Sequence, residues 1–179
     1  MKNKYVMIRG FAFSEESDMN KLKKYAKQGW ILDSIVAGFF YRLKKDKPQN
    51  IDYSLDYQSE ATEEYFNLFK EAGWTLNVSV CNEMHIFSAQ EGTKSIYSDR
   101  ESEIDKYARV KKQTGKGSIY SFIAMIIFAL LVKSTSTTLK PIFIVANVLF
   151  IASMIPFIFN FMPYLAYTYR LRKMKKRGI

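Results

Sequence analysis

Two stretches of the chain, KYAKQGWIL at 24–32 and LFKEAGWTL at 68–76, share one pattern. In each of them, residues at helical spacing lead to a Gly-Trp pair, and a strand-like run follows. Glycine just after the last periodic residue is a stop signal for a helix. The two stretches superimpose at a shift of 44 residues. The sequence therefore predicts an internal repeat.

Outward from these stretches, each copy of the repeat has the same order of expected elements, namely strand, helix, strand, strand. The copies cover about residues 4–45 and 51–90. Two such units predict a duplicated, ferredoxin-like α+β domain over residues 1–98. We expect one antiparallel sheet with two helices on one of its faces. The pattern does not specify the pairing order of the strands between the two copies.

Alternation of apolar and polar residues marks the strands of the second copy. The segment IDYSLDY at 51–57 places its isoleucine, leucine and tyrosines on one face and its polar residues on the other. The segment TLNVSVC at 75–81 places Leu76, Val78 and Val80 on one face. Alternation over this length is typical of strands that bury one side. We expect these apolar faces to form the core.

The C-terminal part of the chain has a different composition. Residues 117–132 are 16 residues without a charge, and residues 141–169 are 29 residues without a charge. A helix that spans a membrane needs about 20 apolar residues. We therefore predict two transmembrane helices at about 117–136 and 141–164, which form a helical hairpin after the α+β domain.

Glycines and prolines mark the breaks that we expect in this part of the chain. Residues 99–116 are predicted to form a connector helix and a hinge, with a break at Gly115 and Gly117. Pro156 and Pro163 are predicted to kink the second transmembrane helix or to end it.

The distribution of charge excludes a uniformly basic, soluble protein. The net charge is +10, but all 17 acidic residues and 16 of the 27 basic residues lie in 1–110. Residues 111–179 hold the other 11 basic residues and no acidic residue. Since the excess charge flanks the apolar segments, we predict contact with a lipid bilayer and no nucleic-acid binding. Cys81 is the only cysteine, which excludes a disulfide scaffold.

Basic residues next to the predicted spans give an orientation in the cell membrane. The loop between the spans carries only Lys133 and Lys140, whereas the outer flanks, including a basic tail at 170–179, carry nine basic residues. Positive charge favours the cytoplasmic side, so we predict two spans with both termini in the cytoplasm. The membrane-orienting residues are Lys111, Lys112, Lys116, Arg170, Arg172, Lys173, Lys175, Lys176 and Arg177.

The sequence contains no pattern that is typical of a catalytic or metal site. Cys81, Glu83 and His85 are of metal-binding types, but Asn82 and Glu83 favour a hairpin turn that would separate Cys81 from His85. We interpret these residues as ordinary residues at a strand edge. We expect no catalytic residue, no metal and no cofactor, and therefore a protein that is not an enzyme.

Aromatic residues are abundant, with 12 Tyr, 14 Phe and 2 Trp. Many of them lie in the predicted α+β domain, and either a core of large side chains or an exposed patch would account for them. As a candidate surface for a partner or a ligand we select Trp30, Tyr57 and Trp74 together with Asp56. The carboxylate of Asp56 lies on the polar, solvated face that the alternation predicts.

Four short motifs connect the chain with a known family. They are LDYQ at 55–58, FKEAGW at 69–74, HIFSA at 85–89 and IYSD at 96–99. With these motifs, residues 20–110 resemble the domain-of-unknown-function 2812 family of bacterial membrane proteins. Members of that family commonly lie beside PadR-type transcriptional regulators, so the resemblance implies a role in membrane stress or regulated transport. It brings no catalytic residues with it.

The expectation that follows is a membrane-anchored, non-enzymatic regulatory or adaptor protein. Its cytoplasmic α+β domain would bind a protein partner, with a link to a PadR-type regulator or a membrane-stress response. Two alternatives stay open: a small-molecule sensor tethered to the membrane, and an accessory or immunity subunit of a membrane transport complex. A homo-oligomer formed through the helical hairpin is an alternative to a separate protein partner.

Overall fold

The structure is a computed structural model that describes residues 2–97, 99–135 and 140–176. The chain forms two compact units, Met1–Lys106 and Tyr107–Ile179. The border between them lies inside the predicted connector helix. Of the expected features, Arg177 and part of the polar loop between the two long helices lie outside the described residues.

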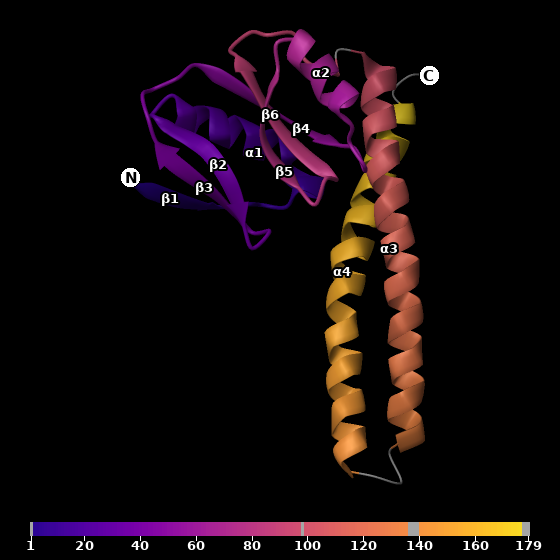
Figure 1. The fold of residues 1–179 in the computed structure, drawn as a ribbon. Coiled ribbons are helices and arrows are strands. Elements are labelled where there is room, and N and C mark those ends of the chain that lie inside the picture. The colour runs from indigo at the N-terminus through magenta and orange to yellow at the C-terminus, as the bar shows by residue number, and fades with distance from the viewer. Residues whose placement is uncertain (1, 98, 136–139, 177–179) are drawn as a thin grey trace. The chain divides into compact units, whose positions relative to one another are not determined.

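The N-terminal unit has the predicted order of elements twice (Figure 1). The first half contains β1 (Asn3–Met7), α1 (Phe11–Ala26), β2 (Trp30–Val36) and β3 (Phe40–Lys45). The second half contains β4 (Ile51–Tyr57), α2 (Glu63–Glu71), β5 (Thr75–Val80) and β6 (Met84–Gln90). The mixed α+β class is therefore confirmed.

The strands form two antiparallel sheets of three strands each, so the prediction of one sheet is wrong. The strand order is β1-β3-β2 in the first sheet and β4-β6-β5 in the second. In each half the last strand lies in the middle and pairs with both of the others. Among the described residues, no strand of one half pairs with a strand of the other, and the backbone N–H of Leu32 in β2 donates to the hydroxyl of Tyr53 in β4 at 3.3 Å. Helix α1 joins the halves, since it contacts both β2 and β4.

The shift of 44 residues also relates the two hairpin turns. Ala37 and Gly38 between β2 and β3 have φ angles of 52° and 72°. Cys81 and Asn82 between β5 and β6 both have a φ of 52°. Two consecutive residues with positive φ form the turn whose twist fits a hairpin. The predicted turn at Asn82 is therefore confirmed, and it begins at Cys81.

A strand irregularity recurs at the same shift. The register of β2 against β3 changes between Leu32 and Ser34, and that of β5 against β6 changes between Leu76 and Val78. Each bulge inserts one residue, which reverses the face of the side chains on one side of it. Leu76 is therefore 38% exposed and Val78 is buried, so the prediction that both face inward is wrong for Leu76.

Both faces of the second sheet are covered. The predicted apolar face of β4 is buried, with Tyr53, Leu55 and the neighbouring Ile86 of β6 all at 7% exposure or less. Helix α2 packs on the opposite face, where the ring of Phe69 stacks on that of Phe87 at 4.2 Å. As a result, the polar face of β4 is not open to solvent as a whole, contrary to the prediction.

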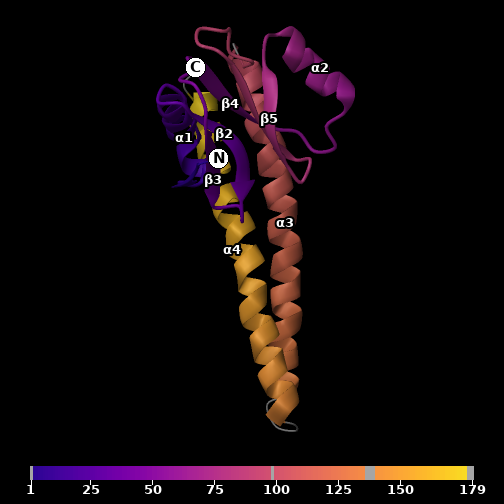
Figure 2. The ribbon, with the colours of Figure 1, turned by 60° about the vertical axis from the view of Figure 1, so that its left-hand side comes forward.

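The C-terminal unit consists mainly of two long helices that run side by side in both views, α3 (Arg100–Thr135) and α4 (Lys140–Lys176) (Figures 1 and 2). Each is long and apolar enough to cross a membrane. Most of their large apolar side chains are exposed, including those of Ile123, Leu130, Ile144 and Ile155. The two segments predicted as spans therefore form two apolar helices.

The predicted break at Gly115 and Gly117 is wrong, and the second helix does not end at its prolines. Helix α3 runs through Gly115 and Gly117, and α4 runs through both prolines to Lys176. At Gly117 an added Cβ atom would lie 2.2 Å from the side-chain oxygen of Asn160. The glycines thus lie where α3 and α4 approach closely, and small residues permit such an approach between helices.

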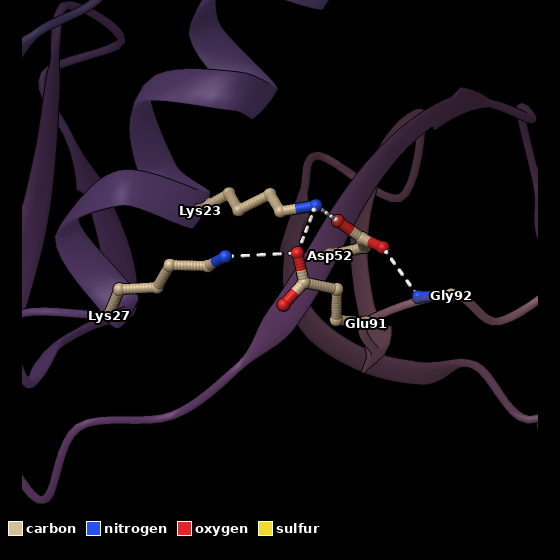
Figure 3. A network of polar contacts seen from close by, with 5 residues as sticks. All are labelled: Lys23, Lys27, Asp52, Glu91 and Gly92. Carbon is tan, nitrogen blue, oxygen red and sulfur yellow. Dashed lines mark hydrogen bonds and ion pairs between the residues drawn. The ribbon is translucent and has the colours of Figure 1, made fainter.

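An ionic network joins the two halves of the N-terminal unit (Figure 3). On α1, the Nζ atom of Lys23 lies 2.6 Å from Asp52 and 3.0 Å from Glu91, and that of Lys27 lies 2.9 Å from Glu91. The backbone N–H of Gly92 donates to the other oxygen of Asp52 at 3.1 Å. These contacts connect α1 with the start of β4 and the end of β6.

The network gives the unit a pH dependence with a definite sign. Hydrogen bonds from Lys27 and Lys23 lower the pKa of Glu91 from its ordinary value of 4.5. A group with a lowered pKa in the folded state stabilises the fold above its ordinary pKa, and this contribution disappears as the pH falls through the folded value. We expect acid to lower the midpoint of urea unfolding below pH 4.5, as followed by tryptophan fluorescence.

The Glu91→Gln variant isolates this effect. It removes the titrating carboxyl, so the midpoint of urea unfolding should fall less between neutral pH and pH 3.5 than it does in the wild type. Glu71→Gln is the matched control, because Glu71 is exposed and lies on α2 away from the network. Equal acid sensitivity of the wild type and Glu91→Gln would contradict the role of Glu91.

Candidate functional site

The carboxylate of Asp56 is the centre of a polar cluster inside the N-terminal unit. Asp56 lies near the end of β4, and its side chain is fully buried. The hydroxyl of Tyr65, on α2, donates to Oδ2 at 2.6 Å, and the hydroxyl of Tyr97 donates to Oδ1. Hydrogen bonds to an ionised acceptor are stronger than those between neutral groups. One carboxylate thus holds together a strand, a helix and the segment that leads to α3.

His85 lies beside this carboxylate. It is the partner of Asp56 in the register of β4 and β6, and it is fully buried. Its Nε2 lies 3.1 Å from the backbone oxygen of Gln58. Since a carbonyl only accepts, Nε2 is the donor in this contact. Nδ1 has no hydrogen-bond partner among the described residues.

The segment at 91–97 after β6, which we call the connector, is attached to the same region by two further contacts. The indole N–H of Trp74 donates to the backbone oxygen of Lys94 at 3.1 Å. Ile96 packs against the apolar cluster that contains Phe69 and Trp74. Together with the bond from Tyr97 to Asp56, these contacts hold the connector against β4, α2 and the start of β5.

A second buried polar contact involves the second turn of α3. The ammonium group of Lys106, which is 4% exposed, forms an ion pair with Glu15 on α1. The same ammonium lies 5.2 Å from the ring centre of Tyr97 and 6.0 Å from that of Tyr57. A cation over aromatic faces is stabilised by their quadrupoles. The end of the N-terminal unit is therefore held by the cluster around Asp56 and by Glu15.

The contacts of this cluster hold the connector against the interior of the N-terminal unit. Asp56 is an acceptor already bound by two hydroxyls, and His85 is enclosed by aromatic rings. Within the described residues, no group of three or more His, Cys, Asp or Glu side chains is arranged to hold a metal ion. We therefore describe the cluster as a clamp on the connector, and call Asp56, Tyr65, His85 and Tyr97 the connector clamp.

The structure separates the residues of the candidate surface. Asp56, Tyr57 and Trp74 are buried at 0%, 7% and 4% exposure, so these three belong to the interior and not to a surface. Their burial follows from the packing of α2 and the connector on the second sheet. Trp30 is half-buried at the start of β2, where the ammonium groups of Lys4 and Lys45 lie 5.0 and 5.1 Å from its ring.

The interpretation of His85 as an edge residue is wrong. His85 lies on β6, the central strand of its sheet, and α2 covers it. Cys81 is exposed in the turn before that strand, as the predicted separation of the two residues requires.

The described membrane-orienting residues lie on the two long helices. Lys111, Lys112 and Lys116 lie on α3 before its apolar part, and the basic residues from Arg170 to Lys176 lie at the end of α4. Within this unit, the guanidinium of Arg170 lies 4.2 Å from the ring centre of Tyr107.

Sequence reasoning missed three members of the connector clamp, Tyr65, His85 and Tyr97. A signal for two of them was present, because His85 begins the HIFSA motif and Tyr97 lies in the IYSD motif. Asp56 lies in the LDYQ motif, so three of the four motifs quoted for the family contribute one side chain each to the clamp. The motifs therefore mark residues that are brought together by the fold.

Comparison with known proteins confirms the family that the four motifs resemble. A search of curated proteins and a search of solved structures find no match to the chain. The family model described as protein of unknown function (DUF2812) matches residues 14–119, which include most of α1, all of α2, both sheets except β1, the clamp and the first part of α3. The chain belongs to the DUF2812 family of proteins of unknown function.

Proposed function

We propose that this chain is a membrane-anchored, non-enzymatic regulatory or adaptor protein whose N-terminal unit binds a protein partner in the cytoplasm. The observation that carries the proposal is the connector clamp, which ties the segment before α3 to the interior of the α+β unit. A change in the unit that displaces Tyr97 from Asp56 would release the segment that leads into the first apolar helix.

The exposed apolar side chains of α3 and α4 support the membrane part of the proposal. Burying such side chains in hydrocarbon is favourable, whereas exposing them to water costs free energy in proportion to their area. The basic residues at the start of α3 and the end of α4 support the predicted orientation, with both ends of the hairpin in the cytoplasm.

The shared strand order, turns and bulges of the two halves support an origin by duplication of one ferredoxin-like β-α-β-β unit. In this proposal the two copies have diverged in function. The second copy carries Asp56 and His85 and controls the connector, and the first copy is available to a partner. A PadR-type regulator and a component of a membrane-stress response are the partners to test first.

Labelling of Cys81 tests the orientation in intact cells. Cys81 is the only cysteine and is exposed, so a membrane-impermeant maleimide should label it only after the membrane is permeabilised. In a Cys81→Ser background, Ser134→Cys places a thiol at the end of α3 between the two apolar segments, and it should be labelled in intact cells. Labelling of Cys81 in intact cells would overturn the predicted orientation.

Co-purification tests the partner. The full chain is purified in a mild detergent with its associated proteins, and we expect a stoichiometric protein partner in the wild type. Tyr97→Phe removes the hydroxyl that binds Asp56 and keeps the ring, so it should change the amount of partner recovered by a factor of about three or more. Tyr5→Phe, at an exposed site on β1, is the matched control. Recovery of no stoichiometric partner would overturn the proposal.

A further inference from the structure

The basic residues of α1 lie in two different electrostatic environments. Lys23 and Lys27 form ion pairs with Asp52 and Glu91. Lys21 and Lys24, on the same helix, form no ion pair with a carboxylate of the described residues, and neither does Arg9 in the loop before it. These three cations give an excess of positive charge around one side of the helix.

The three unpaired cations line one hollow. Its volume is about 480 Å³, and it is lined by Arg9, Glu16, Ser17, Asn20, Lys21 and Lys24. Glu16 is the only carboxylate among these six residues, so the lining has an excess of two positive charges. Ser17 and Asn20 add a hydroxyl and an amide that can donate hydrogen bonds.

Three hydrogen bonds position the lining. The backbone N–H of Arg9 donates to Oδ2 of Asp18 at 3.0 Å, and Asp18 is fully buried. The guanidinium of Arg9 lies 3.4 Å from the hydroxyl of Ser17, and the ammonium of Lys21 donates to the backbone oxygen of Met7 at 3.1 Å. The loop before α1 is thus attached to the helix, with its cations held around the hollow rather than on separate surfaces.

We propose that this hollow binds a phosphate-type oxyanion. A guanidinium presents a planar fork of donors that matches a phosphate, and an ammonium adds a compact charge. Two lysines, one arginine, a hydroxyl and an amide within one hollow supply both the charge and the donors for such a group. The site involves no residue of the connector clamp, so it goes beyond the proposed function, and the two proposals are tested independently.

Two sources supply this chemistry, a soluble phosphate compound and the phosphate of an anionic lipid headgroup. Met7 and Phe13 are each 65% exposed and lie on either side of Arg9 in the sequence. Exposed apolar side chains beside cations are typical of surfaces that contact lipid headgroups. The experiment below therefore includes an arm for each source.

The test uses the full chain in a neutral detergent, with pyrophosphate as the probe and isothermal titration calorimetry at constant ionic strength. We expect saturable binding to the wild type. The triple variant Arg9→Gln, Lys21→Gln, Lys24→Gln should bind at least about tenfold more weakly, because it loses every cation of the hollow. Lys24→Glu is the second variant, since Lys24 is exposed and its exchange tests the charge without altering the loop.

The control has the same change in charge elsewhere on the unit. Lys47→Gln, Lys70→Gln, Lys94→Gln removes three exposed cations outside the hollow, and it should bind pyrophosphate like the wild type. Equal weakening in the control, undiminished binding in both hollow variants, or no binding by the wild type would each overturn the site.

Nanodiscs distinguish the two sources. In discs of neutral phosphatidylcholine the wild type should bind pyrophosphate as it does in detergent. Unchanged affinity in discs that contain phosphatidylglycerol assigns the site to a soluble phosphate compound. The alternative result is that phosphatidylglycerol lowers the affinity for pyrophosphate in the wild type and in the control, but leaves that of the triple variant unchanged. This result assigns the site to the lipid headgroup. Co-purification of the protein partner with the triple variant keeps this test separate from that of the proposed function.

Discussion

Asp56→Ala is expected to lower the free energy of unfolding of the N-terminal unit by about 2–4 kcal/mol. The carboxylate is fully buried and accepts the hydroxyls of Tyr65 and Tyr97. Its removal leaves both hydroxyls without their acceptor and opens a space beside His85. The measurement is urea unfolding of the full chain in detergent by tryptophan fluorescence, which reports this unit because both tryptophans lie in it.

A double-mutant cycle shows whether the clamp carries this loss. If the hydroxyl of Tyr97 acts through Asp56, Tyr97→Phe should lower the free energy of unfolding less in the Asp56→Ala background than in the wild type. The difference, which is the coupling energy, should be about 1 kcal/mol or more. Glu83→Ala, at an exposed turn position, is the control and should change stability by less than about 0.5 kcal/mol. Equal losses for Asp56→Ala and Glu83→Ala would show that the clamp does not hold the connector.

Local features of the fold were predictable because local sequence determines them. The Gly-Trp pairs predict where α1 and α2 end and where β2 begins, and the hairpin turns lie at the shift that aligns those pairs. Strand pairing depends on contacts between distant segments. One sheet was therefore predicted where two are found, and the bulge that exposes Leu76 was not foreseen.

Features that depend on packing partners were predicted incorrectly. Asp56 lies on the polar face of an alternating strand, and the packing of α2 and the connector over that face explains its burial. Gly115 and Gly117 are helix-breaking residues by propensity, and the close approach of Asn160 to Gly117 explains why they lie inside α3. The clamp combines both kinds of contact, so its residues were visible in the family motifs but its geometry was not.

The two glycines of the repeat should respond differently to alanine. Gly29 and Gly73 both have positive φ, at 76° and 85°. An alanine in that conformation costs about 1–2 kcal/mol at either position. At Gly29 the new Cβ atom would also lie 2.4 Å from the backbone oxygen of Asp46, whereas at Gly73 its nearest neighbour would be the methyl of Thr93 at 3.5 Å.

The close backbone contact makes the difference measurable. A backbone oxygen cannot rotate away as a side chain can, so relief of the clash must move the segment after β3, whose Asp46 N–H donates to the oxygen of Gly29 at 2.9 Å. We expect Gly29→Ala to lower the free energy of unfolding by about 3–4 kcal/mol and Gly73→Ala by about 1 kcal/mol. Both are measured by urea unfolding with tryptophan fluorescence.

Gly38→Ala is the control for backbone strain alone, because Gly38 has a φ of 72° and an added Cβ atom there would meet nothing within 4 Å. It should lower the free energy of unfolding by the same amount as Gly73→Ala. If Gly29→Ala costs no more than these two variants, the approach of Asp46 does not constrain that position, and the two copies of the repeat are equivalent at their helix ends. If it costs more by the expected margin, the same Gly-Trp pair has different consequences in the two copies, since one lies beneath a crossing chain segment and the other does not.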